Sequence, residues 1–390
     1  MSSGFAGWNL AALLVLWLLV LVAARRLLFV AAALLPARAS LSPAELPELC
    51  VLVAIRDGGD DTPVLLEAIQ RLRYPEDRWS LVIVDDGSRD GTGEALRRWV
   101  KGHPRRVLLQ HTESLGKAAS LQEALLRLEP GVEVVAVLDV DTSPEPSFLR
   151  ELVRPFADPR CGAVTGCARP ILDRCQPISL YGALEMWVVQ GITLAAKDRL
   201  RLNPPTIGGM CAYRRSALEQ SGGFPAGEQA EDIAVSLAMI ARGWHTRFHP
   251  QAAIGLRTVR HWRHFLHQRR RWSTSLLASS PRVRGLESLV VVLGYADRML
   301  TIAGLMLVWA GSLPAGVLVL LLLPMVVTVL AALGKARPPA AVIVPLLLWL
   351  LPLYLLDVYV SVSAPLAMLR RSPLPWLSRA EAESPRGRLF

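Results

Sequence analysis

Residues 81–100 read LVIVDDGSRDGTGEALRRWV, and this stretch indicates the fold of the middle of the chain. An apolar run ends in the acidic turn DDGS at residues 85–88, and an amphipathic segment follows at residues 93–100. An apolar strand, a tight polar turn and a helix in this order are typical of a βα unit in a parallel sheet. Ligands bind beyond the carboxyl ends of such strands, so the acidic turn also marks a candidate site.

The same alternation of short β-rich runs and amphipathic helices continues from residue 48 to about residue 244. It predicts strands at residues 49–54, 81–85, 107–110, 134–139 and 163–165. Helices are expected between them, at residues 62–73, 93–100 and 118–128, and a later one at residues 232–242. The pattern predicts an α/β fold with a parallel, Rossmann-like sheet.

The N-terminal part is apolar enough to lie in lipid. Hydrophobic residues make up 52% of the 390 residues, which is unusual for a soluble enzyme of this size. Residues 10–24 are almost all apolar, Arg25 and Arg26 follow, and residues 27–35 are apolar again. A signal peptide is the competing interpretation, but its positive charge should precede the apolar core. We therefore expect a membrane anchor with its N-terminus outside and the rest of the chain starting in the cytoplasm.

The last third contains candidate spans at residues 289–309, 313–333 and 340–362. Asp297-Arg298 would be costly in hydrocarbon, so either the pair neutralises itself inside the bundle or residues 286–297 lie along the interface. Three crossings from a cytoplasmic start would leave the basic tail outside, against the positive-inside tendency. The number of spans stays open, because Pro345 and Pro352 permit a re-entrant hairpin. The tail carries Arg370 and Arg371.

The net charge of +10 fits a membrane surface better than nucleic acid. Local basic clusters lie beside apolar segments, where they suit the negative inner leaflet. We therefore expect membrane lipids, and no nucleic acid, as partners of a multi-pass protein of the inner (plasma) membrane. An odd number of cysteines without a C-x-x-C pair argues against a disulfide framework and favours reduced thiols in a cytosolic domain. These are Cys50, Cys161, Cys167, Cys175 and Cys211.

Asp139 and Asp141 follow an apolar strand and flank a single residue, Val140. An extended chain can turn both carboxylates toward one cation while the residue between them points into the core. Hard oxygen ligands suit Mg²⁺ or Mn²⁺, and a bound diphosphate would complete the shell. Such an ion offsets charge on a departing phosphate. The alternative is that this three-letter pattern is a solvated turn.

Three other strand ends or helix starts carry charge. Asp85 and Asp86 end one strand and Arg56-Asp57 ends the first, although turn chemistry alone also favours Asp, Gly and Ser there. Lys117 follows a glycine at a helix start, where a cation and free N–H groups face a diphosphate. A solvated surface lysine is the simpler interpretation of Lys117.

Two further motifs lie nearer the C-terminus. Glu231 and Asp232 open a helix, where the macrodipole favours carboxylates without any function. The functional alternative makes Asp232 a general base that takes a proton from an acceptor hydroxyl. The run QRRRW at residues 268–272 precedes the membrane segments. Such a run is by default an interfacial anchor, yet Trp and Arg at fixed spacing also stack on a sugar and hold phosphate.

Taken in order, these motifs resemble the inverting family 2 glycosyltransferases. They look most like the membrane-embedded processive synthases of cellulose, hyaluronan, chitin and poly-N-acetylglucosamine. The resemblance covers roughly residues 49–272 and extends to the flanking membrane segments. Five motifs in the right order with a Q-x-x-R-W ending make the signal specific: Asp85-Asp86, Lys117, Asp139-Val140-Asp141, Glu231-Asp232 and Gln268-Arg269-Arg270-Arg271-Trp272.

The resemblance implies a GT-A fold that binds a nucleotide sugar, usually a UDP-sugar. Asp57, with Asp85 or Asp86, would hold the base and ribose, and Lys117 would lie near the diphosphate. Asp139 and Asp141 would bind the diphosphate-bound Mg²⁺ or Mn²⁺. Asp232, next to Glu231, would be the base for a single displacement with inversion. The acceptor side and the closure over the donor would involve Gly209, in the Gly208-Gly209-Met210-Cys211 stretch, with Gln268, Arg271 and Trp272.

The sequence also departs from the family pattern. The first strand usually ends in P-x-(Y or R)-(N or D)-E, but residues 54–58 read AIRDG, without the proline and the glutamate. Ala230 replaces the threonine that commonly precedes the Glu-Asp pair. The membrane part is also small beside that of cellulose synthase. The altered first motif bears on which nucleotide the chain would prefer. The small membrane part argues against a full polymer-conducting channel.

The sequence therefore predicts three parts. Residues 1–47 form an anchor and linker, residues 48–284 a cytoplasmic GT-A domain with an interfacial Q-x-x-R-W segment, and residues 285–390 the C-terminal membrane helices and basic tail. The predicted function is transfer of sugar from a UDP-sugar to a growing polysaccharide. The alternatives are a single addition to a lipid or lipid-linked acceptor, and an inactive relative that regulates a synthase or binds the membrane surface.

Overall fold

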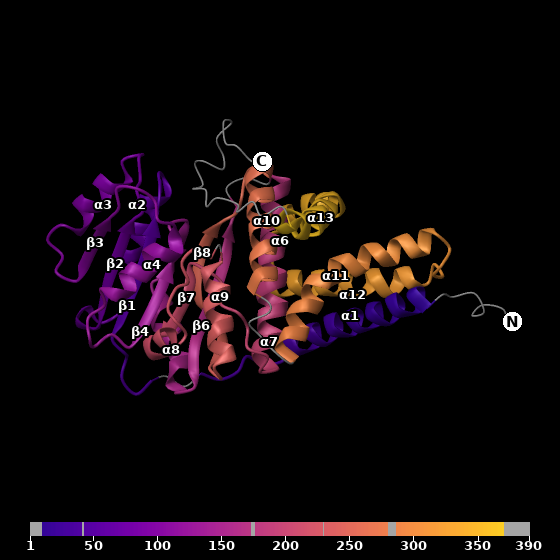
Figure 1. Cartoon of the computed structure of the whole chain (residues 1–390), viewed down its shortest axis with the longest axis horizontal. Helices are drawn as coiled ribbons and strands as arrows, with labels where there is room; N and C mark the ends of the chain where they lie inside the picture. Colours follow the sequence, from indigo (N-terminus) through magenta and orange to yellow (C-terminus); the bar gives the residue numbers. More distant parts are fainter. Residues whose placement is uncertain (1–9, 41–42, 173–175, 229, 280–285, 370–390) are drawn as a thin grey trace.

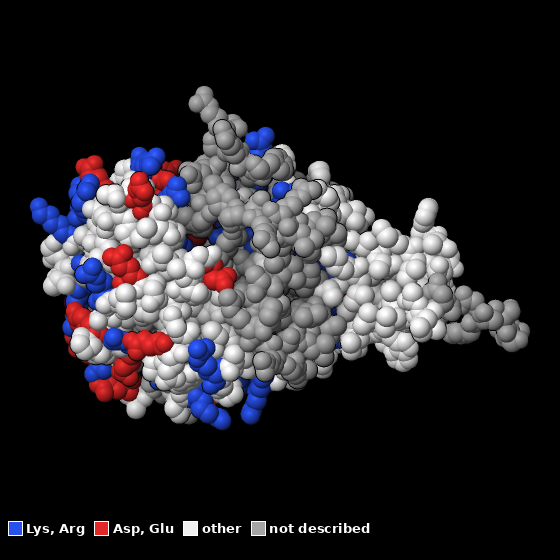
Figure 2. Space-filling view, in the orientation of Figure 1, with Lys and Arg blue, Asp and Glu red and all other residues white. Residues whose placement is uncertain are grey.

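A computed structural model describes residues 10–40, 43–172, 176–228, 230–279 and 286–369 of the chain. Figure 1 shows an α/β part on one side and long helices that project from it on the other. Charged side chains cover the α/β part, whereas the visible surface of the projecting helices is free of them (Figure 2). This division of charge is the one expected between water and hydrocarbon.

The α/β part is built on one sheet of eight strands in the order β3-β2-β1-β4-β7-β6-β8-β5. Strands β1 to β4 run parallel to one another, whereas β7 runs antiparallel to both β4 and β6. The edge strand β5 pairs antiparallel with β8. The strands are β1 Leu49–Ile55, β2 Trp79–Asp85, β3 Arg106–Gln110, β4 Val134–Leu138, β5 Thr142–Pro144, β6 Cys161–Ile171, β7 Met210–Arg214 and β8 His245–Arg257.

Two hydrophobic clusters cover the two faces of this sheet. Every residue of β1 is buried, as expected for a central strand with helices on both sides. The shorter helical elements are α2 Asp61–Gln70, η1 Glu76–Arg78, α3 Thr92–Val100, α4 Lys117–Leu126, α5 Phe148–Val153, η2 Arg154–Ala157, α8 Arg215–Gln220 and α9 Glu231–Ala241.

The α/β class predicted from the sequence is confirmed, and the parallel arrangement is correct for β1 to β4. It is wrong for the other half of the sheet, where β5, β7 and β8 were not predicted and the pairing is mixed. The predicted helices are present, and α2, α3, α4 and α9 each begin one residue before the predicted start. Strand β7 was missed because pairing with β4 and β6 depends on chain segments far apart in sequence.

Four described helices are long and apolar enough to cross a membrane: Leu10–Leu34, Pro177–Arg199, Val317–Ala336 and Ala340–Val360. The first is α1, and the second comprises α6 Pro177–Val188, the π-helical η3 Val189–Leu194 and α7 Ala195–Arg199. The last two belong to α12 Val317–Ala336 and α13 Ala340–Leu369. The Pro177–Arg199 segment was not among the predicted spans.

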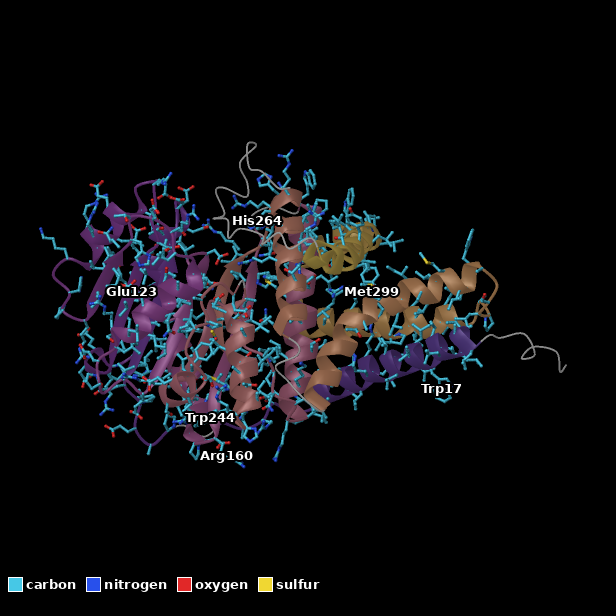
Figure 3. The ribbon with its side chains drawn as sticks, viewed as in Figure 1. Trp17, Glu123, Arg160, Trp244, His264 and Met299 are labelled. Atoms are coloured by element: carbon cyan, nitrogen blue, oxygen red, sulfur yellow. The ribbon has the colours of Figure 1, made fainter. Side chains whose placement is uncertain are left out.

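Figure 1 shows that α1, α12 and α11 (Leu286–Trp309) run lengthwise beside one another. Contacts between each pair of these helices agree with the picture. The α6 helix and α10 (Trp262–Ser279) run across this bundle at its junction with the sheet, and α13 is seen nearly end-on. Trp17 lies on the outer side of α1 and is 72% exposed (Figure 3), which suits a lipid-facing position. The α6–α7 segment thus runs across the bundle at its junction with the sheet, and not alongside α1, α11 and α12.

The two charged residues in the middle of α11 form ion pairs with residues of other helices. Asp297 pairs with Arg25 and Arg26 of α1 at 2.8 and 2.7 Å, and Arg298 pairs with Asp357 of α13 at 2.9 Å. The expectation that Asp297 and Arg298 neutralise each other is thus wrong in detail, because each has its own partner on another helix. The re-entrant hairpin that Pro345 and Pro352 would permit does not form, since α13 is one continuous helix. Arg370 and Arg371 lie outside the described residues.

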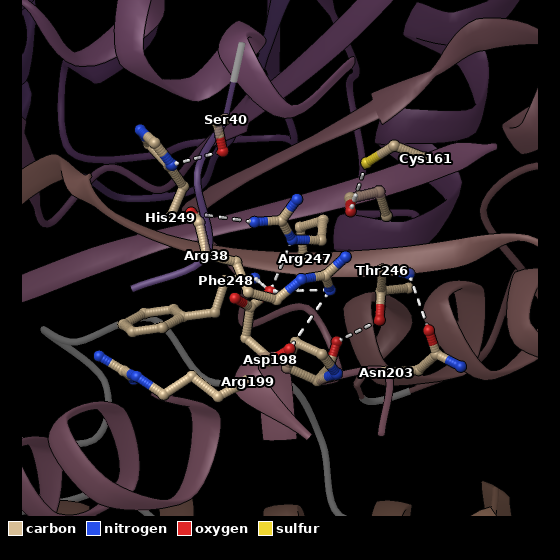
Figure 4. A network of polar contacts seen from close by, with 12 residues as sticks. Arg38, Ser40, Cys161, Asp198, Arg199, Asn203, Thr246, Arg247, Phe248 and His249 are labelled. Carbon is tan, nitrogen blue, oxygen red and sulfur yellow. Dashed lines mark hydrogen bonds and ion pairs between the residues drawn. The ribbon is translucent and has the colours of Figure 1, made fainter. Parts of the chain in front are cut away.

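A buried polar network joins the segment after α1 to the sheet (Figure 4). Asp198, at the end of α7, accepts a hydrogen bond from Arg247 Nε of β8 at 2.7 Å and one from the Phe248 backbone N–H at 3.2 Å. Arg38 lies 3.9 Å from the same carboxylate, and Ser40 is 3.4 Å from His249 Nδ1. The linker is therefore fixed to the strand that leads into α10.

Asp297→Asn tests the interhelical ion pairs. Removing this carboxylate leaves Arg25 and Arg26 without their anion in a partly buried site, so we expect a loss of about 3–5 kcal/mol in the free energy of unfolding. Unfolding in detergent micelles measures it. The control is Glu67→Gln, whose partner Arg71 is 52% exposed and whose loss should cost below about 0.5 kcal/mol. Equal effects of the two substitutions would contradict a structural role for Asp297.

Candidate functional site

Lys117 lies at the centre of a cluster of carboxylates beyond the carboxyl end of β4. Its Nζ atom is 2.6 Å from Asp139 Oδ1 and 2.7 Å from Glu231 Oε1. Lys117 begins α4, Asp139 follows β4, and Glu231 begins α9, so three separate elements meet at one ammonium group. The side chain of Lys117 is only 14% exposed, which rules out the solvated surface lysine considered from the sequence.

The electrostatics of the cluster keep Lys117 positively charged. Burial by itself would lower its pKa, but the nearby carboxylates of Asp139, Glu231 and Asp232 raise that pKa well above the ordinary value. Opposite charges at this distance stabilise the charged form of each group. The cluster therefore presents a fixed cation among three anionic side chains.

Asp232 has the environment of a carboxylate that can accept a proton. Its Oδ1 accepts a hydrogen bond from the Ile233 N–H at 2.8 Å, and its Oδ2 accepts one from the Gly208 N–H. Burial, together with the negative charge of Glu231, raises the pKa of Asp232 to about 6, although Lys117 and the two N–H groups act against the shift. A carboxylate poised near neutral pH is suited to general base catalysis.

Gly208 and Gly209 lie directly against these charged groups, and the absence of a side chain at both positions lets the groups approach the backbone. A methyl group at Gly208 would lie 3.2 Å from Asp232 Oδ2 and 3.3 Å from Lys117 Nζ. One at Gly209 would lie 2.8 Å from Asp139 Oδ2, and Gly209 also has a φ of +74°. Only glycine satisfies both constraints at this position. Gly209 thus lies against the carboxylate of Asp139.

Both carboxylate oxygens of Asp86 accept hydrogen bonds from other groups of the protein. It is 1% exposed and accepts five hydrogen bonds at 2.6–3.1 Å. Burial by itself would raise its pKa, but these bonds hold the pKa below the ordinary value. The carboxylate fixes the loop that leads directly to Lys117. The donors are His111 Nδ1, Ser114 Oγ, the Leu115 and Gly116 N–H groups and Ser120 Oγ.

Asp57 joins the loops after β1 and β2, and Asp85 connects the loop after β2 to the end of β3. Asp57 adopts a φ of +46°, and its Oδ1 accepts a hydrogen bond from the Arg89 N–H at 2.7 Å. Asp85 accepts hydrogen bonds from the Ser88 N–H at 3.0 Å and from Gln110 Nε2 at 3.1 Å. A left-handed aspartate is uncommon and marks a constrained loop. Both residues lie at the predicted edge of the sheet, in contact with protein groups.

The residues present fit a divalent cation in part. Asp139 follows β4 and Asp141 precedes β5, which places two hard oxygen donors one residue apart. Asp139 Oδ1 already faces a cation, the ammonium of Lys117. Over the described part of the chain, no group of three or more His, Cys, Asp and Glu side chains is placed to hold a metal. A bound Mg²⁺ or Mn²⁺ would therefore need oxygens from a ligand such as a diphosphate.

Gln268, Arg271 and Trp272 lie on α10, the helix that follows β8. The α10 helix contacts α9, which begins with Glu231 and Asp232. Gln268 and Arg271 are half-buried, and Trp272 is 40% exposed. Phe265, one or two turns earlier on the same helix, is fully buried. The helix is therefore anchored at its start and more open at Trp272.

Sequence reasoning missed His111, Ser114 and Ser120, which hold Asp86. It named Gly208 only as part of the stretch at residues 208–211, and did not predict the hydrogen bond from its N–H to Asp232. The glycine pair before the apolar run of β7 was a usable signal for close backbone approach. His111 and the serines carried no such signal, because their partner is distant in the chain.

Asp86→Asn tests the support of the Lys117 loop. The amide places an NH₂ group where the carboxylate now accepts hydrogen bonds, so we expect the unfolding free energy to fall by at least about 1.5–3 kcal/mol. Donor affinity should fall with it, because Lys117 loses its fixed position. Thermal unfolding and a donor titration measure the two effects. Asp77→Asn is the control, since Asp77 is exposed; a similar small effect at both positions would refute the supporting role of Asp86.

Comparisons with known proteins place these features in a family. The family model described as "Glycosyltransferase like family 2" matches residues 47–275. The "Probable glycosyltransferase YdaM" of Bacillus subtilis is 26% identical over 231 residues, which cover 59% of this chain and 55% of that protein. A poly-beta-1,6-N-acetyl-D-glucosamine synthase of Staphylococcus aureus is 28% identical over 215 residues, covering 53% and 49%. The chain thus spans about half the length of these relatives.

A solved structure shares the fold over almost the whole chain. The mannosyltransferase PcManGT from Pyrobaculum calidifontis, in complex with GDP-Man and Mn²⁺, has a TM-score of 0.60 and 24% identity. The likeness covers 93% of this chain and 96% of that one, the long helices included. The expected GT-A fold is therefore confirmed. Because the family model spans more than half of the residues, this chain belongs to the glycosyltransferase like family 2.

Proposed function

We propose that this chain transfers a sugar from a nucleotide-diphosphate donor to an acceptor hydroxyl, with Asp232 as the general base and inversion at the sugar. The observation that carries the proposal is the position of Asp232. Its carboxylate, with a pKa raised to about 6, lies beside Lys117 and is held by the Gly208 and Ile233 N–H groups. A base and a phosphate-binding cation thus occupy one site.

The roles of the other side chains follow from their charges. Asp232 takes the proton of the acceptor hydroxyl as its oxygen bonds to the anomeric carbon, and the bond from that carbon to the diphosphate breaks. Attack opposite the leaving group inverts the configuration. Lys117 offers its ammonium group to the diphosphate, for which Asp139 and Glu231 hold it in place. Gln268, Arg271 and Trp272 close over the donor and position the acceptor.

Asp139 and Asp141 would hold a divalent cation together with the donor. Such an ion, when bound, neutralises charge on the departing diphosphate. The Mn²⁺ named with the mannosyltransferase supports the assignment without deciding between Mg²⁺ and Mn²⁺. Asp57, Asp85 and Asp86 are proposed for the base and ribose side. Because Asp86 already accepts five hydrogen bonds, we assign the donor contacts there to Asp57 and Asp85 first, with Asp86 supporting.

We propose a UDP-sugar as donor and a growing polysaccharide as acceptor, by analogy with the poly-N-acetylglucosamine synthases. GDP-sugars are the second donor class, because the mannosyltransferase of similar fold binds GDP-Man. Residues 48–284 would act in the cytoplasm at the inner membrane, between an anchor at residues 1–47 and membrane helices at residues 285–390. Membrane lipids would surround the apolar helices.

Nucleotide release from purified protein in lipid nanodiscs tests the enzyme and names the donor. UDP-, GDP- and CMP-sugars are compared with Mg²⁺, with Mn²⁺ and with a chelator. We expect release from one donor, and Asp232→Asn should lower its turnover by about 10²–10⁴-fold while donor affinity stays nearly constant. The substitution removes the proton acceptor but keeps the shape of the side chain. A variant with normal turnover would exclude Asp232 as the base.

Asp141→Ala tests the cation site by binding alone. We expect donor affinity to depend on Mg²⁺ or Mn²⁺ in the unmodified protein, and this dependence should disappear in the variant because one carboxylate ligand is lost. Calorimetric titration of donor with and without chelator measures it. Asp77→Asn, which changes an exposed carboxylate, should keep the dependence. If Asp141→Ala keeps it as well, the cation binds elsewhere.

The second candidate function is addition of a single sugar to a lipid or lipid-linked acceptor. It is favoured by the small membrane part, in which α1, α11 and α12 run together. The size of the product separates the two candidates. A ladder of sizes supports polysaccharide synthesis, and a single chloroform-soluble species supports the lipid acceptor.

A further inference from the structure

One stripe of α10 carries a buried aromatic residue, a buried cation and the exposed Trp272. Phe265, Arg269 and Trp272 are spaced by four and three residues, which places them on the same side of a helix. Phe265 is 1% exposed and Arg269 6%, so the stripe leads from the protein interior to the more open Trp272. Arg269 is one of the unspecified positions in Q-x-x-R-W, to which the sequence assigned no role.

The guanidinium of Arg269 is held between the two aromatic rings. Its central carbon is 4.8 Å from the centre of the Phe265 ring and 4.6 Å from that of the Trp272 ring. Both distances lie within the range of cation–π attraction, which is stronger for tryptophan than for phenylalanine. The direction of the Trp272 side chain is therefore coupled to the position of Arg269.

Glu185 of α6 fixes Arg269 from the opposite side. The two nitrogens at the end of Arg269 face the two carboxylate oxygens of Glu185, Nη1 toward Oε1 and Nη2 toward Oε2. This two-point arrangement restrains rotation of the guanidinium as well as its position. A lysine could not reproduce it, because an ammonium group has no planar fork.

A second contact between α6 and α10 lies one turn away. Tyr181 of α6 packs edge-on against Phe265, with ring centres 5.9 Å apart. Leu353 of α13 completes this buried cluster. Tyr181 and Glu185 are four residues apart, so one face of α6 meets two successive turns of α10. The Arg269–Glu185 ion pair therefore lies one turn from the packed contact between Tyr181 and Phe265.

Arg269 needs an anion because it remains charged in a buried place. Burial lowers its pKa to about 10, which still leaves it protonated at neutral pH. A buried cation without a paired anion is strongly destabilising. Glu185 supplies that anion beside the rings, and Asp357 contributes further negative charge.

We propose that Glu185 and Arg269 are positioning residues that set the orientation of Trp272 for acceptor transfer. The inference rests on the proposed function, in which Trp272 positions the acceptor. Neither residue is assigned a contact with the donor or the acceptor. Their effect reaches the reaction through the Arg269–Trp272 stack and through the placement of α10 on α6.

Glu185→Gln tests this proposal, because it removes the charge and keeps the size of the side chain. We expect transfer to acceptor to fall about 10- to 100-fold relative to donor hydrolysis, since a misplaced acceptor reacts slowly while water does not need Trp272. The KM for donor should change less than the transfer rate, since Asp57, Lys117 and Asp139 are unchanged and only the closure of Trp272 over the donor is affected. Glu219→Gln is the matched control, as Glu219 pairs with Arg215 at an exposed site.

Two further variants separate positioning from folding. Glu185→Asp keeps the charge on a shorter side chain and gives a folded protein with an intermediate ratio if Glu185→Gln does not fold. The double exchange Glu185→Arg with Arg269→Glu restores a pair between α6 and α10 but moves the cation off the Trp272 ring. It should recover thermal stability without recovering the transfer-to-hydrolysis ratio.

The outcomes distinguish this inference from the proposed function. Equal losses of transfer and hydrolysis, following the loss of thermal stability, would show a folding role only and overturn the inference. So would a Glu185→Gln variant that behaves like Glu219→Gln while Trp272→Ala still impairs transfer. If Trp272→Ala itself leaves transfer unchanged, the proposed role of Trp272 fails, and this inference fails with it.

Discussion

The charge balance around Lys117 is the constraint on which the site depends. Asp139 follows β4, whereas Glu231 and Asp232 begin α9, and these carboxylates would repel one another if the ammonium did not lie among them. The two ion pairs of Lys117 join the start of α4, the end of β4 and the start of α9. The same arrangement leaves Asp232 with a raised pKa and Lys117 firmly charged, so a carboxylate able to accept a proton lies beside a fixed cation.

The order and direction of the strands place these charged residues close to one another. Strands β1, β2 and β4 end at one edge. Asp57 joins the loops after β1 and β2, and Asp86 joins the loop after β2 to the segment after β3. The antiparallel strand β7 enters beside β4 and carries the glycine pair at residues 208–209 against Asp139 and Asp232. A purely parallel sheet would not bring the start of β7 to the end of β4. The mixed half of the sheet therefore completes the site.

The long apolar helices are tied to this site rather than attached to it loosely. The network of Asp198, Arg247 and Arg38 fixes the linker after α1 to β8, and β8 leads into α10 (Figure 4). The α6 and α10 helices then lie between the sheet and the bundle. Ion pairs of Asp297 with α1 and of Arg298 with α13 hold the bundle itself. An acceptor at the membrane surface would thus reach a candidate site that is held at a fixed distance from the apolar helices.

The sequence by itself determined the α/β class, the four parallel strands and their helices, and the apolar character of α1, α12 and α13. These depend on local periodicity and composition, which act over a few turns or strand pairs. It also predicted Lys117, Asp139, Glu231, Asp232 and Gly209, which the structure brings together; their roles remain predictions. Only the tertiary structure decided that Lys117 is buried, that Asp86 is saturated with hydrogen bonds, that Asp297 and Arg298 pair with other helices, and that Glu185 holds Arg269. Each of these depends on partners distant in the chain, and single-sequence patterns carry no information on such contacts.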